Sequence, residues 1–207
     1  MTGQRIKKIG IMGGTFNPIH IGHLLLAENA KDNFALDEIL FIPSGCSYMK
    51  KTSEVADRQT RYEMTRLAIA DNPSFSISDI EVKREGNTYT YETLLQLKEQ
   101  QPETEFYFIV GADSLFSMET WKKPEIIFEN CILLAAVRDD KKRKDLEAQI
   151  LYLKEKFHAR IHPISMQEIS ISSTDIRNRI KEQRSVRYMV PEQVVSYIKE
   201  HQLYMED

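Results

Sequence analysis

The stretch GIMGGTFNPIHIGHLLLAENA occupies residues 10–30. Its first residues are apolar and strand-like, two glycines follow, and a helical pattern then begins in which Leu26, Ala30 and Phe34 recur on one face. A second apolar run, EILFIPS, comes soon after at residues 38–44. Strand, helix and strand within so short a span predict a βαβ crossover, which is the usual unit of a parallel sheet.

The same alternation continues along the chain. Apolar runs that indicate further strands are followed by helical patterns, at residues 75–82, 105–113, 131–137 and 159–164 for strands and 57–70, 90–101, 141–157, 173–183 and 191–202 for helices. We therefore expect an α/β fold, a doubly wound, mostly parallel Rossmann-like sheet with helices on both faces. A chain of 207 residues is expected to form a single domain, residues 1–207, with 165–207 as a C-terminal helical segment.

Composition excludes several classes of protein. The 28 basic and 31 acidic residues give a net charge of −3, so the broad positive surface of a nucleic-acid binder is not expected. The two cysteines form no C-x-x-C pair, which argues against a zinc site or a disulfide framework. No apolar run approaches the ~20 residues that a membrane span needs. We expect a cytoplasmic protein without nucleic-acid or membrane partners and without a dedicated metal-ligand cluster.

The glycine-histidine loop is the first candidate site. Gly13 and Gly14 let the backbone approach a ligand closely, and the N-terminus of the following helix attracts anions. Neither G-x-x-x-x-G-K-[ST] nor G-x-G-x-x-G is present. Instead His20 and His23 lie one turn apart on the same side of the helix start, where they could stabilise charge on a phosphoryl group. Ordinary helix-start residues or a metal site are the alternatives at this point.

This stretch resembles the first motif of bacterial nicotinate mononucleotide adenylyltransferases. HIGH matches the H-x-G-H signature of the wider nucleotidyltransferase superfamily, which cytidylyltransferases, pantetheine-phosphate adenylyltransferase and some aminoacyl-tRNA synthetases share. The resemblance implies that His20 and His23 are catalytic. It also implies ATP contacts along the loop, at Gly13, Gly14, Thr15 and Phe16.

Two further stretches match the family in order. ISISSTDIRNRI, residues 169–180, begins a helix with hydroxyl residues that could simply be caps. It resembles the family's I-S-S-T-x-x-R motif, which implies that this C-terminal segment completes the ATP site with a catalytic Arg177 and the ATP-binding residues Ile171, Ser172, Ser173 and Thr174. FIVGADS ends a strand at Gly111, and Asp113 either caps a helix or, as the resemblance implies, lies by the ATP ribose.

The remaining matches concern the mononucleotide. The resemblance implies that Trp121 stacks on the pyridine ring and that the amides of Thr90 and Lys122 bind its carboxylate. It places Arg138 near the mononucleotide phosphate and makes Lys50 a catalytic residue that closes over the phosphates.

The chain departs from the family pattern at three positions. Asn17 stands where Asp is commoner, which we expect to matter little; Met49 replaces a histidine; and Arg138 lacks the usual Pro-Gly after it.

The sequence thus predicts transfer of the adenylyl group of ATP to nicotinate mononucleotide, giving deamido-NAD and pyrophosphate. Mg²⁺ is expected to accompany ATP, held mostly by phosphate oxygens and water. The alternatives are an adenylyltransferase for nicotinamide mononucleotide or phosphopantetheine, and a non-catalytic nucleotide-binding module. Assembly into a homo-oligomer is left open.

Overall fold

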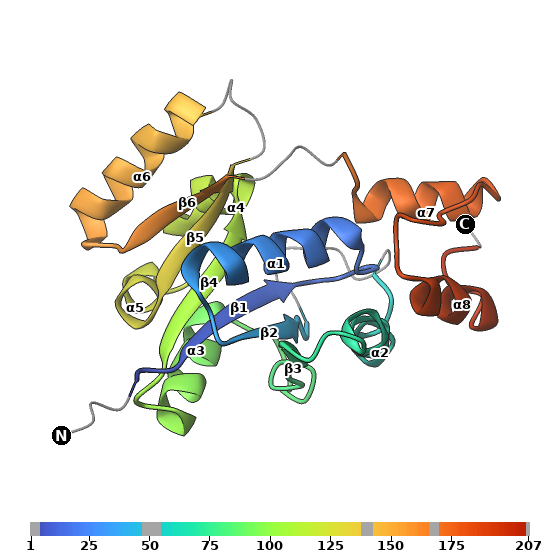
Figure 1. Cartoon of the computed structure of the whole chain (residues 1–207), viewed down its shortest axis with the longest axis horizontal. Coiled ribbons are helices and arrows are strands. Elements are labelled where there is room, and N and C mark those ends of the chain that lie inside the picture. The colour runs from blue at the N-terminus through green and yellow to red at the C-terminus, as the bar shows by residue number, and fades with distance from the viewer. Residues whose placement is uncertain (1–4, 47–54, 138–142, 166–169, 206–207) are drawn as a thin grey trace. The chain divides into compact units, whose positions relative to one another are not determined.

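A six-stranded sheet organises the chain, in the order β3-β2-β1-β4-β5-β6 (Figure 1). The computed structural model describes residues 5–46, 55–137, 143–165 and 170–205. The pairs β1–β4, β4–β5 and β5–β6 are parallel, so the predicted α/β class is confirmed. The strands are β1 (Lys8–Gly14), β2 (Glu38–Pro43), β3 (Phe75–Ile77), β4 (Glu105–Gly111), β5 (Ile132–Val137) and β6 (Ile161–Ser165).

The helices follow the predicted alternation with two additions. Those predicted are α1 (Ile21–Phe34), α2 (Arg58–Ile69), α3 (Thr90–Gln100), α6 (Arg143–Phe157), α7 (Ser173–Lys181) and α8 (Glu192–Glu200). The additions are the short helices α4 (Ala112–Ser117) and α5 (Pro124–Asn130). The strand expected at 75–82 was wrong in extent, because β3 has only 3 residues and the chain turns after it, with Lys83 N–H donating to the Asp79 carbonyl.

The chain divides into two compact units, each built from several stretches of sequence. The first unit comprises Met1–Gly13, Ala27–Leu40 and Tyr89–Glu168, and the second comprises Gly14–Leu26, Phe41–Thr88 and Ile169–Asp207.

In the first unit, helices cover both faces of the sheet. The Phe34 ring of α1 contacts the Tyr107 ring on β4, with centroids 6.3 Å apart. The Lys98 ammonium of α3 lies over the ring of Phe106, 5.4 Å from its centroid. Because neighbouring residues of a strand point to opposite faces, α1 and α3 pack on opposite sides of β4. This is the doubly wound arrangement that the sequence predicts.

The order of the strands reverses beside β1 in the same unit. β1 pairs with β4 so that Met12 lies opposite Ile109, and Gly13 and Gly111 therefore stand at the ends of adjacent strands. Sheets of this kind bind ligands at the carboxyl ends of their strands, beside this reversal. The topology thus places the glycine loop where a nucleotide is expected.

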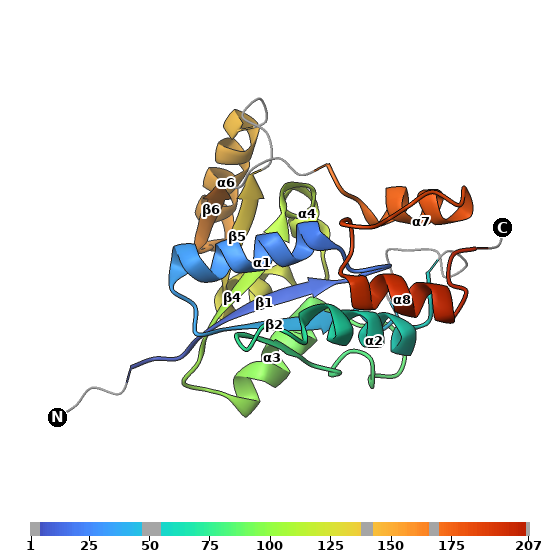
Figure 2. The same cartoon turned by 45° about the vertical axis from the view of Figure 1, so that its right-hand side comes forward.

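In the second unit, α2 and α8 pack against each other, as both Figure 1 and Figure 2 show. Asp57 caps α2, its carboxylate accepting from the N–H groups of Gln59 and Thr60. The inward face of α2 carries Met64, and that of α8 carries Ile198; both side chains are buried. Apolar residues at helical spacing thus hold the C-terminal helix α8 against α2 within the second unit.

We predict that Gly45→Ala lowers the free energy of unfolding by about 1–3 kcal/mol, because the added Cβ overlaps backbone atoms that must shift to accommodate it. Gly45 is buried after β2, and an added Cβ would overlap the Glu81 carbonyl oxygen and lie 2.8 Å from the Thr88 methyl carbon. Gly111→Ala is the matched control, since no described heavy atom lies within 4 Å of its added Cβ. Urea unfolding measures both; equal midpoint shifts would contradict the prediction.

Candidate active site

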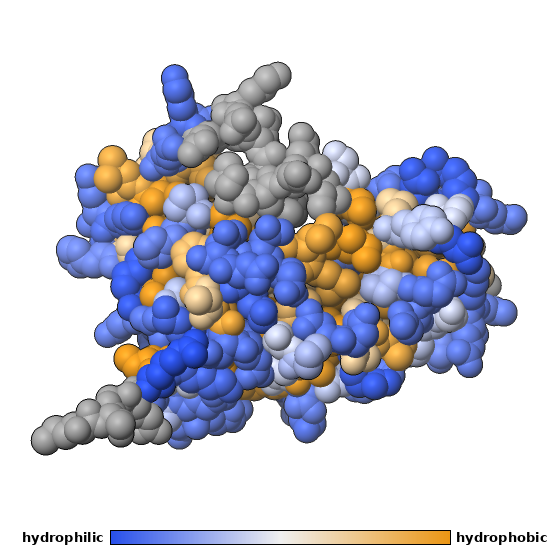
Figure 3. Space-filling model, in the orientation of Figure 1, coloured by the Kyte–Doolittle hydropathy of each residue, from blue (hydrophilic) through white to orange (hydrophobic). Residues whose placement is uncertain are grey.

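The two histidines of the loop form a stacked pair in the second unit. Their ring centroids are 3.7 Å apart with an interplanar angle of 25°. His20 is 4% exposed and His23 is half-buried at the start of α1. The surface beside them is apolar, since Leu25 is 39% exposed and Figure 3 shows hydrophobic residues over this end of α1. Because His20 is buried and His23 is half-buried, hydrogen bonds from their rings are less weakened by water than those of exposed side chains.

The backbone at the helix start fixes the tautomer of the neutral His23 ring. The His20 N–H donates to Nδ1 of His23 at 3.2 Å, so in the neutral ring the proton sits on Nε2. The His20 carbonyl accepts from the His23 N–H at 2.9 Å and begins the helix. A Cβ on Gly22 would lie 3.1 Å from the His20 ring, which explains the glycine of H-x-G-H. The arrangement presents Nε2–H of His23 as a hydrogen-bond donor.

The glycine-histidine loop takes its shape from Phe16. This residue has a left-handed backbone, with φ of 50°, and its ring is buried against the edge of His23, 5.1 Å between centroids. A Cβ on Gly14 would lie 2.8 Å from the Phe16 ring. Gly14 is thus needed for the ring to fold back under the loop. Left-handed conformations at non-glycine residues persist where the surroundings enforce them, often at functional sites.

The start of α7 is tied to the segment just before H-x-G-H. Ser172 caps the helix, accepting from the Asp175 N–H at 3.1 Å. Ser173 donates its hydroxyl to the Pro18 carbonyl at 2.8 Å, and Arg177 donates from Nη1 to the Asn17 carbonyl at 2.9 Å. Arg177 Nη2 also reaches the Thr174 hydroxyl at 3.4 Å. The structure therefore brings the two predicted ATP motifs together within one unit.

Asn17 is a functional residue that sequence reasoning underrated. Its side-chain oxygen accepts from the Ala56 N–H at 3.1 Å and from the Tyr204 hydroxyl at 2.9 Å. Asn17 is 4% exposed. Burial raises the pKa of Tyr204, which keeps its hydroxyl protonated and able to donate. One side chain thus joins the histidine loop, the entry to α2 and the C-terminal segment.

Arg61 is the second residue that sequence reasoning missed. It is 2% exposed on α2 and donates to backbone carbonyls, including that of Thr15 in the glycine-histidine loop. The available signal was its spacing: Arg61, Met64 and Ala68 share the helix face that is otherwise apolar. A cation on a buried helix face must find hydrogen-bond partners, and Arg61 finds them in the backbone.

The mononucleotide candidates gather in the first unit. Trp121 is half-buried, meets Phe108 edge-on with centroids 6.4 Å apart, and donates from Nε1 to the Ser117 hydroxyl at 3.4 Å. Lys122 lies over the ring of Tyr89, 4.1 Å from its centroid, next to Thr90 at the start of α3. Thr90, Trp121 and Lys122 are therefore neighbours, as their predicted shared role requires.

The other predicted residues lie at the starts or ends of elements in either unit, or outside the described residues. Gly111 ends β4 and Asp113 is exposed in the first turn of α4, without capping that helix. Ile171 and Thr174 lie at the start of α7. Lys50 and Arg138 lie outside the described residues.

No cluster of three or more His, Cys, Asp or Glu side chains that could hold a metal ion occurs within residues 5–46, 55–137, 143–165 and 170–205. Over the same described stretches, no helix has the length and apolar character to cross a membrane.

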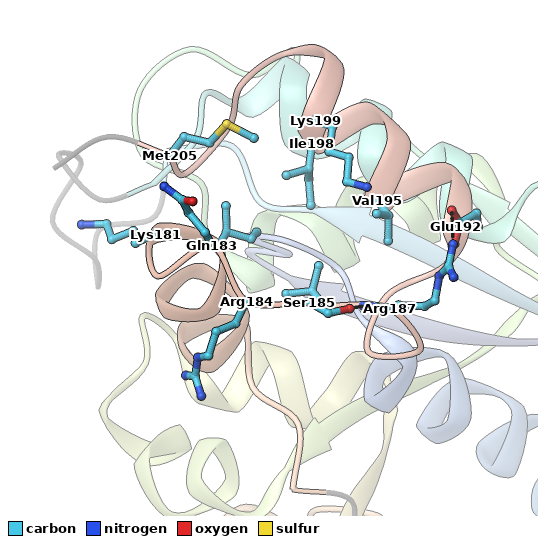
Figure 4. Close-up of a pocket in the computed structure, with 12 residues that line it drawn as sticks. Lys181, Gln183, Arg184, Ser185, Arg187, Glu192, Val195, Ile198, Lys199 and Met205 are labelled. Carbon is cyan, nitrogen blue, oxygen red and sulfur yellow. Dashed lines mark hydrogen bonds and ion pairs between the residues drawn. The ribbon is translucent and has the colours of Figure 1, made fainter.

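A pocket of about 570 Å³ lies in the second unit between the end of α7 and α8 (Figure 4). Its floor is apolar, and Figure 4 shows Val195 and Ile198 facing into it. The Arg187 guanidinium at its rim lies 3.7 Å from the Glu192 carboxylate. None of the predicted site residues lines this pocket.

The sheet order and the H-x-G-H pair after its first strand define the α/β nucleotidyltransferase class. The cytidylyltransferase-like family model matches residues 11–179. A probable nicotinate-nucleotide adenylyltransferase of Lachnoclostridium phytofermentans is 50% identical over 97% of this chain and 100% of its own. One from Moorella thermoacetica is 43% identical over 97% and 93%. The chain belongs to the nicotinate-nucleotide adenylyltransferase family within the cytidylyltransferase-like proteins.

Solved structures agree at the level of the fold. The nicotinic acid mononucleotide adenylyltransferase of Plasmodium falciparum, in complex with NaAD, superposes with a TM-score of 0.79 at 21% identity, over 96% of this chain and 97% of its own. A second structure of that enzyme, in complex with APC, gives a TM-score of 0.76 at 22% identity over the same shares.

We predict that Asn17→Ala lowers the free energy of unfolding by about 1–3 kcal/mol, because the Ala56 N–H and the Tyr204 hydroxyl lose a buried acceptor. Asn17→Asp keeps an acceptor oxygen for both donors, so it should cost clearly less. Chemical denaturation of the three proteins at neutral pH makes the comparison. Equal losses in the two variants would show that the acceptor is unimportant.

Proposed function

We propose that the chain transfers the adenylyl group of ATP to nicotinate mononucleotide, producing deamido-NAD and pyrophosphate. The single observation that carries this function is 50% identity, over nearly the whole chain, to a relative of that name. The geometry of the second unit supports it, because the histidine pair and the start of α7 meet in one place. An α/β nucleotidyltransferase with both motifs intact has what adenylyl transfer requires.

The reaction needs no side-chain nucleophile. A phosphate oxygen of the mononucleotide attacks the α-phosphorus of ATP in line, the bond from that phosphorus to the bridging oxygen breaks, and pyrophosphate leaves with the electron pair. The protein contributes positioning and charge stabilisation. We assign this to His20 and His23, with Nε2–H of His23 as one donor, and to the amides of Thr15 and Phe16.

The start of α7 is assigned to the outgoing pyrophosphate. Ser173, Thr174 and Arg177 stand at a helix N-terminus, which favours anions. Arg177 holds the Asn17 carbonyl with one nitrogen and so is already oriented before substrate arrives. Ile171 and Ser172 are assigned to ATP in the same segment, Gly13 and Gly14 to close approach of the loop, and Gly111 and Asp113 to the ribose. Closure by Lys50 stays a prediction.

The acceptor is assigned to the first unit. The amides of Thr90 and Lys122 would bind the nicotinate carboxylate, and Trp121 would stack on the pyridine ring. The Lys122 side chain adds a positive charge beside this carboxylate site, from its place over Tyr89. Contact of Arg138 with the mononucleotide phosphate stays a prediction.

Mg²⁺ is the expected companion of ATP. We expect it to be held by phosphate oxygens and water rather than by the protein. When bound, such an ion supplies charge neutralisation of the phosphates. A cytoplasmic location and assembly into a homo-oligomer stay predictions, the latter open to sedimentation analysis.

Product analysis tests the proposed function directly. The protein is incubated with ATP, Mg²⁺ and nicotinate mononucleotide, and deamido-NAD and pyrophosphate are measured in equal amounts. Parallel reactions with nicotinamide mononucleotide and phosphopantetheine separate the related adenylyltransferases. Absence of adenylyl transfer to all three acceptors, from folded protein, would overturn the proposal.

We predict that His20→Ala or His23→Ala lowers kcat by about 10²–10³-fold while changing ATP affinity far less, because these donors act most strongly on the charge of the transition state. Steady-state kinetics and calorimetric titration with an ATP analogue give the two quantities. His201→Ala is the control, since His201 is exposed at the end of α8. A wild-type rate in either loop variant would remove that histidine from the mechanism.

We predict a strong preference for nicotinate over nicotinamide mononucleotide, with Trp121 contributing affinity and not the preference. A carboxamide would turn an NH₂ group toward a backbone donor and leave a buried donor unpaired, at about 1–3 kcal/mol. Stacking treats the two rings alike. Trp121→Ala should therefore raise KM for both mononucleotides and keep their ratio of kcat/KM.

Phe116→Ala supplies the control for this substitution, as an aromatic residue of the same unit that is 40% exposed on α4. Equal wild-type kcat/KM values for the two mononucleotides would exclude the carboxylate site. Loss of the ratio in the Trp121 variant alone would show that Trp121 orients the ring for recognition.

A further inference from the structure

Arg61 is a buried cation whose described hydrogen-bond acceptors are all backbone carbonyls. Nε donates to the Ala56 carbonyl at 2.9 Å and Nη1 to the Thr15 carbonyl at 2.7 Å. Nη2 donates to the carbonyls of Ser44 and Gly45 at 2.7 and 3.0 Å. Burial lowers the pKa of Arg61, yet from so high a value that the guanidinium stays charged. Four charge-assisted hydrogen bonds compensate for its removal from water.

These four carbonyls belong to three separate segments of the second unit. Thr15 is in the glycine-histidine loop, Ser44 and Gly45 follow β2, and Ala56 precedes α2. A guanidinium presents its N–H groups in a rigid planar fork, so one side chain fixes all three segments in a single geometry. A lysine cannot do this, because its three donors radiate from one nitrogen atom.

The bond to Thr15 determines where the next amide points. In a trans peptide the C=O of one residue and the N–H of the next are antiparallel, and the Thr15–Phe16 bond is not among the cis bonds of the chain. Since the Thr15 carbonyl faces Arg61, the Phe16 N–H is directed away from it. That N–H finds no acceptor among the residues that the structure describes, although Phe16 is only 2% exposed. Buried N–H groups without an acceptor are rare in native proteins and indicate a donor kept for a ligand.

We propose that Arg61 is a positioning residue for adenylyl transfer: by holding the Thr15 carbonyl, it aims the Phe16 N–H at the α-phosphate of ATP. This rests on the proposed function. The charge of Arg61 adds a second effect on the same side of the loop, where the carboxylates of Asp57 and Glu81 offset only part of it. In a protein of net charge −3, that local charge favours an anionic ligand.

Three variants test the role. Arg61→Met removes every donor at similar length, and Arg61→Lys keeps the charge and some of the donors. Arg58→Met is the matched control, since Arg58 is exposed on the same helix and donates to the Arg84 carbonyl at 2.9 Å. We expect kcat to fall about 10²–10³-fold in Arg61→Met and about tenfold or more in Arg61→Lys, with KM for the mononucleotide little changed and Arg58→Met equal to wild type.

A direct readout of the Phe16 amide separates positioning from simple stability. ¹⁵N-labelled protein is titrated with α,β-methylene-ATP and Mg²⁺, and the Phe16 amide proton resonance should move downfield in wild type and in Arg58→Met. In Arg61→Lys this shift should be lost or reduced, while circular dichroism shows the fold retained. If Arg61→Met does not fold, Arg61→Lys carries the test by itself.

A folded Arg61→Lys protein with wild-type kcat and a wild-type Phe16 shift would overturn the inference. So would a loss of activity matched by the loss of folded protein alone. If wild type forms no deamido-NAD but the Phe16 amide responds to the ATP analogue and the response depends on Arg61, the proposed function fails and the positioning role stands.

Discussion

A loop that offers its N–H groups to an anion must satisfy its carbonyl groups on the opposite side. The second unit meets this constraint with three side chains from two distant places in the sequence, α2 and α7. Arg61 takes the Thr15 carbonyl, Arg177 takes that of Asn17, and Ser173 takes that of Pro18. Three of the four positions from Thr15 to Pro18 are held in this way, and the fourth is Phe16, whose ring is itself buried. These hydrogen bonds to the carbonyl side fix the shape of the loop without a ligand.

Much of the fold follows from local patterns, and the exceptions have local causes. The parallel strands and the long helices were predictable because each buries a continuous run or one periodic face. The helices α4 and α5 escaped because 6 and 7 residues are too few to show a helical period, although Pro124 at the start of α5 was a usable signal. The strand over 75–82 was overextended because alternation persists past Ile77, where the chain in fact turns.

The candidate site shows the same contrast between local sequence patterns and long-range contacts. Its chemistry-bearing residues are contiguous motifs, so the sequence located His20, His23, Ser173 and Arg177 and the structure brings them together. Their supporting residues are pairs that no pattern connects: Arg61 reaches 46 residues back to Thr15, and Tyr204 reaches 187 residues back to Asn17. A periodicity shows that Arg61 is on a buried face, but only the folded chain shows which carbonyls lie there.

The hydrogen bond from Tyr204 to Asn17 has a consequence for how the protein is made. The histidine loop is synthesised before the groups that hold it, because α7 and Tyr204 lie more than 150 residues further along the chain. A nascent chain can complete β1 and α1 early, but its loop lacks Ser173, Arg177 and Tyr204 until those residues leave the ribosome. A chain that stopped before α7 would therefore retain the H-x-G-H letters without the hydrogen bonds that hold the loop.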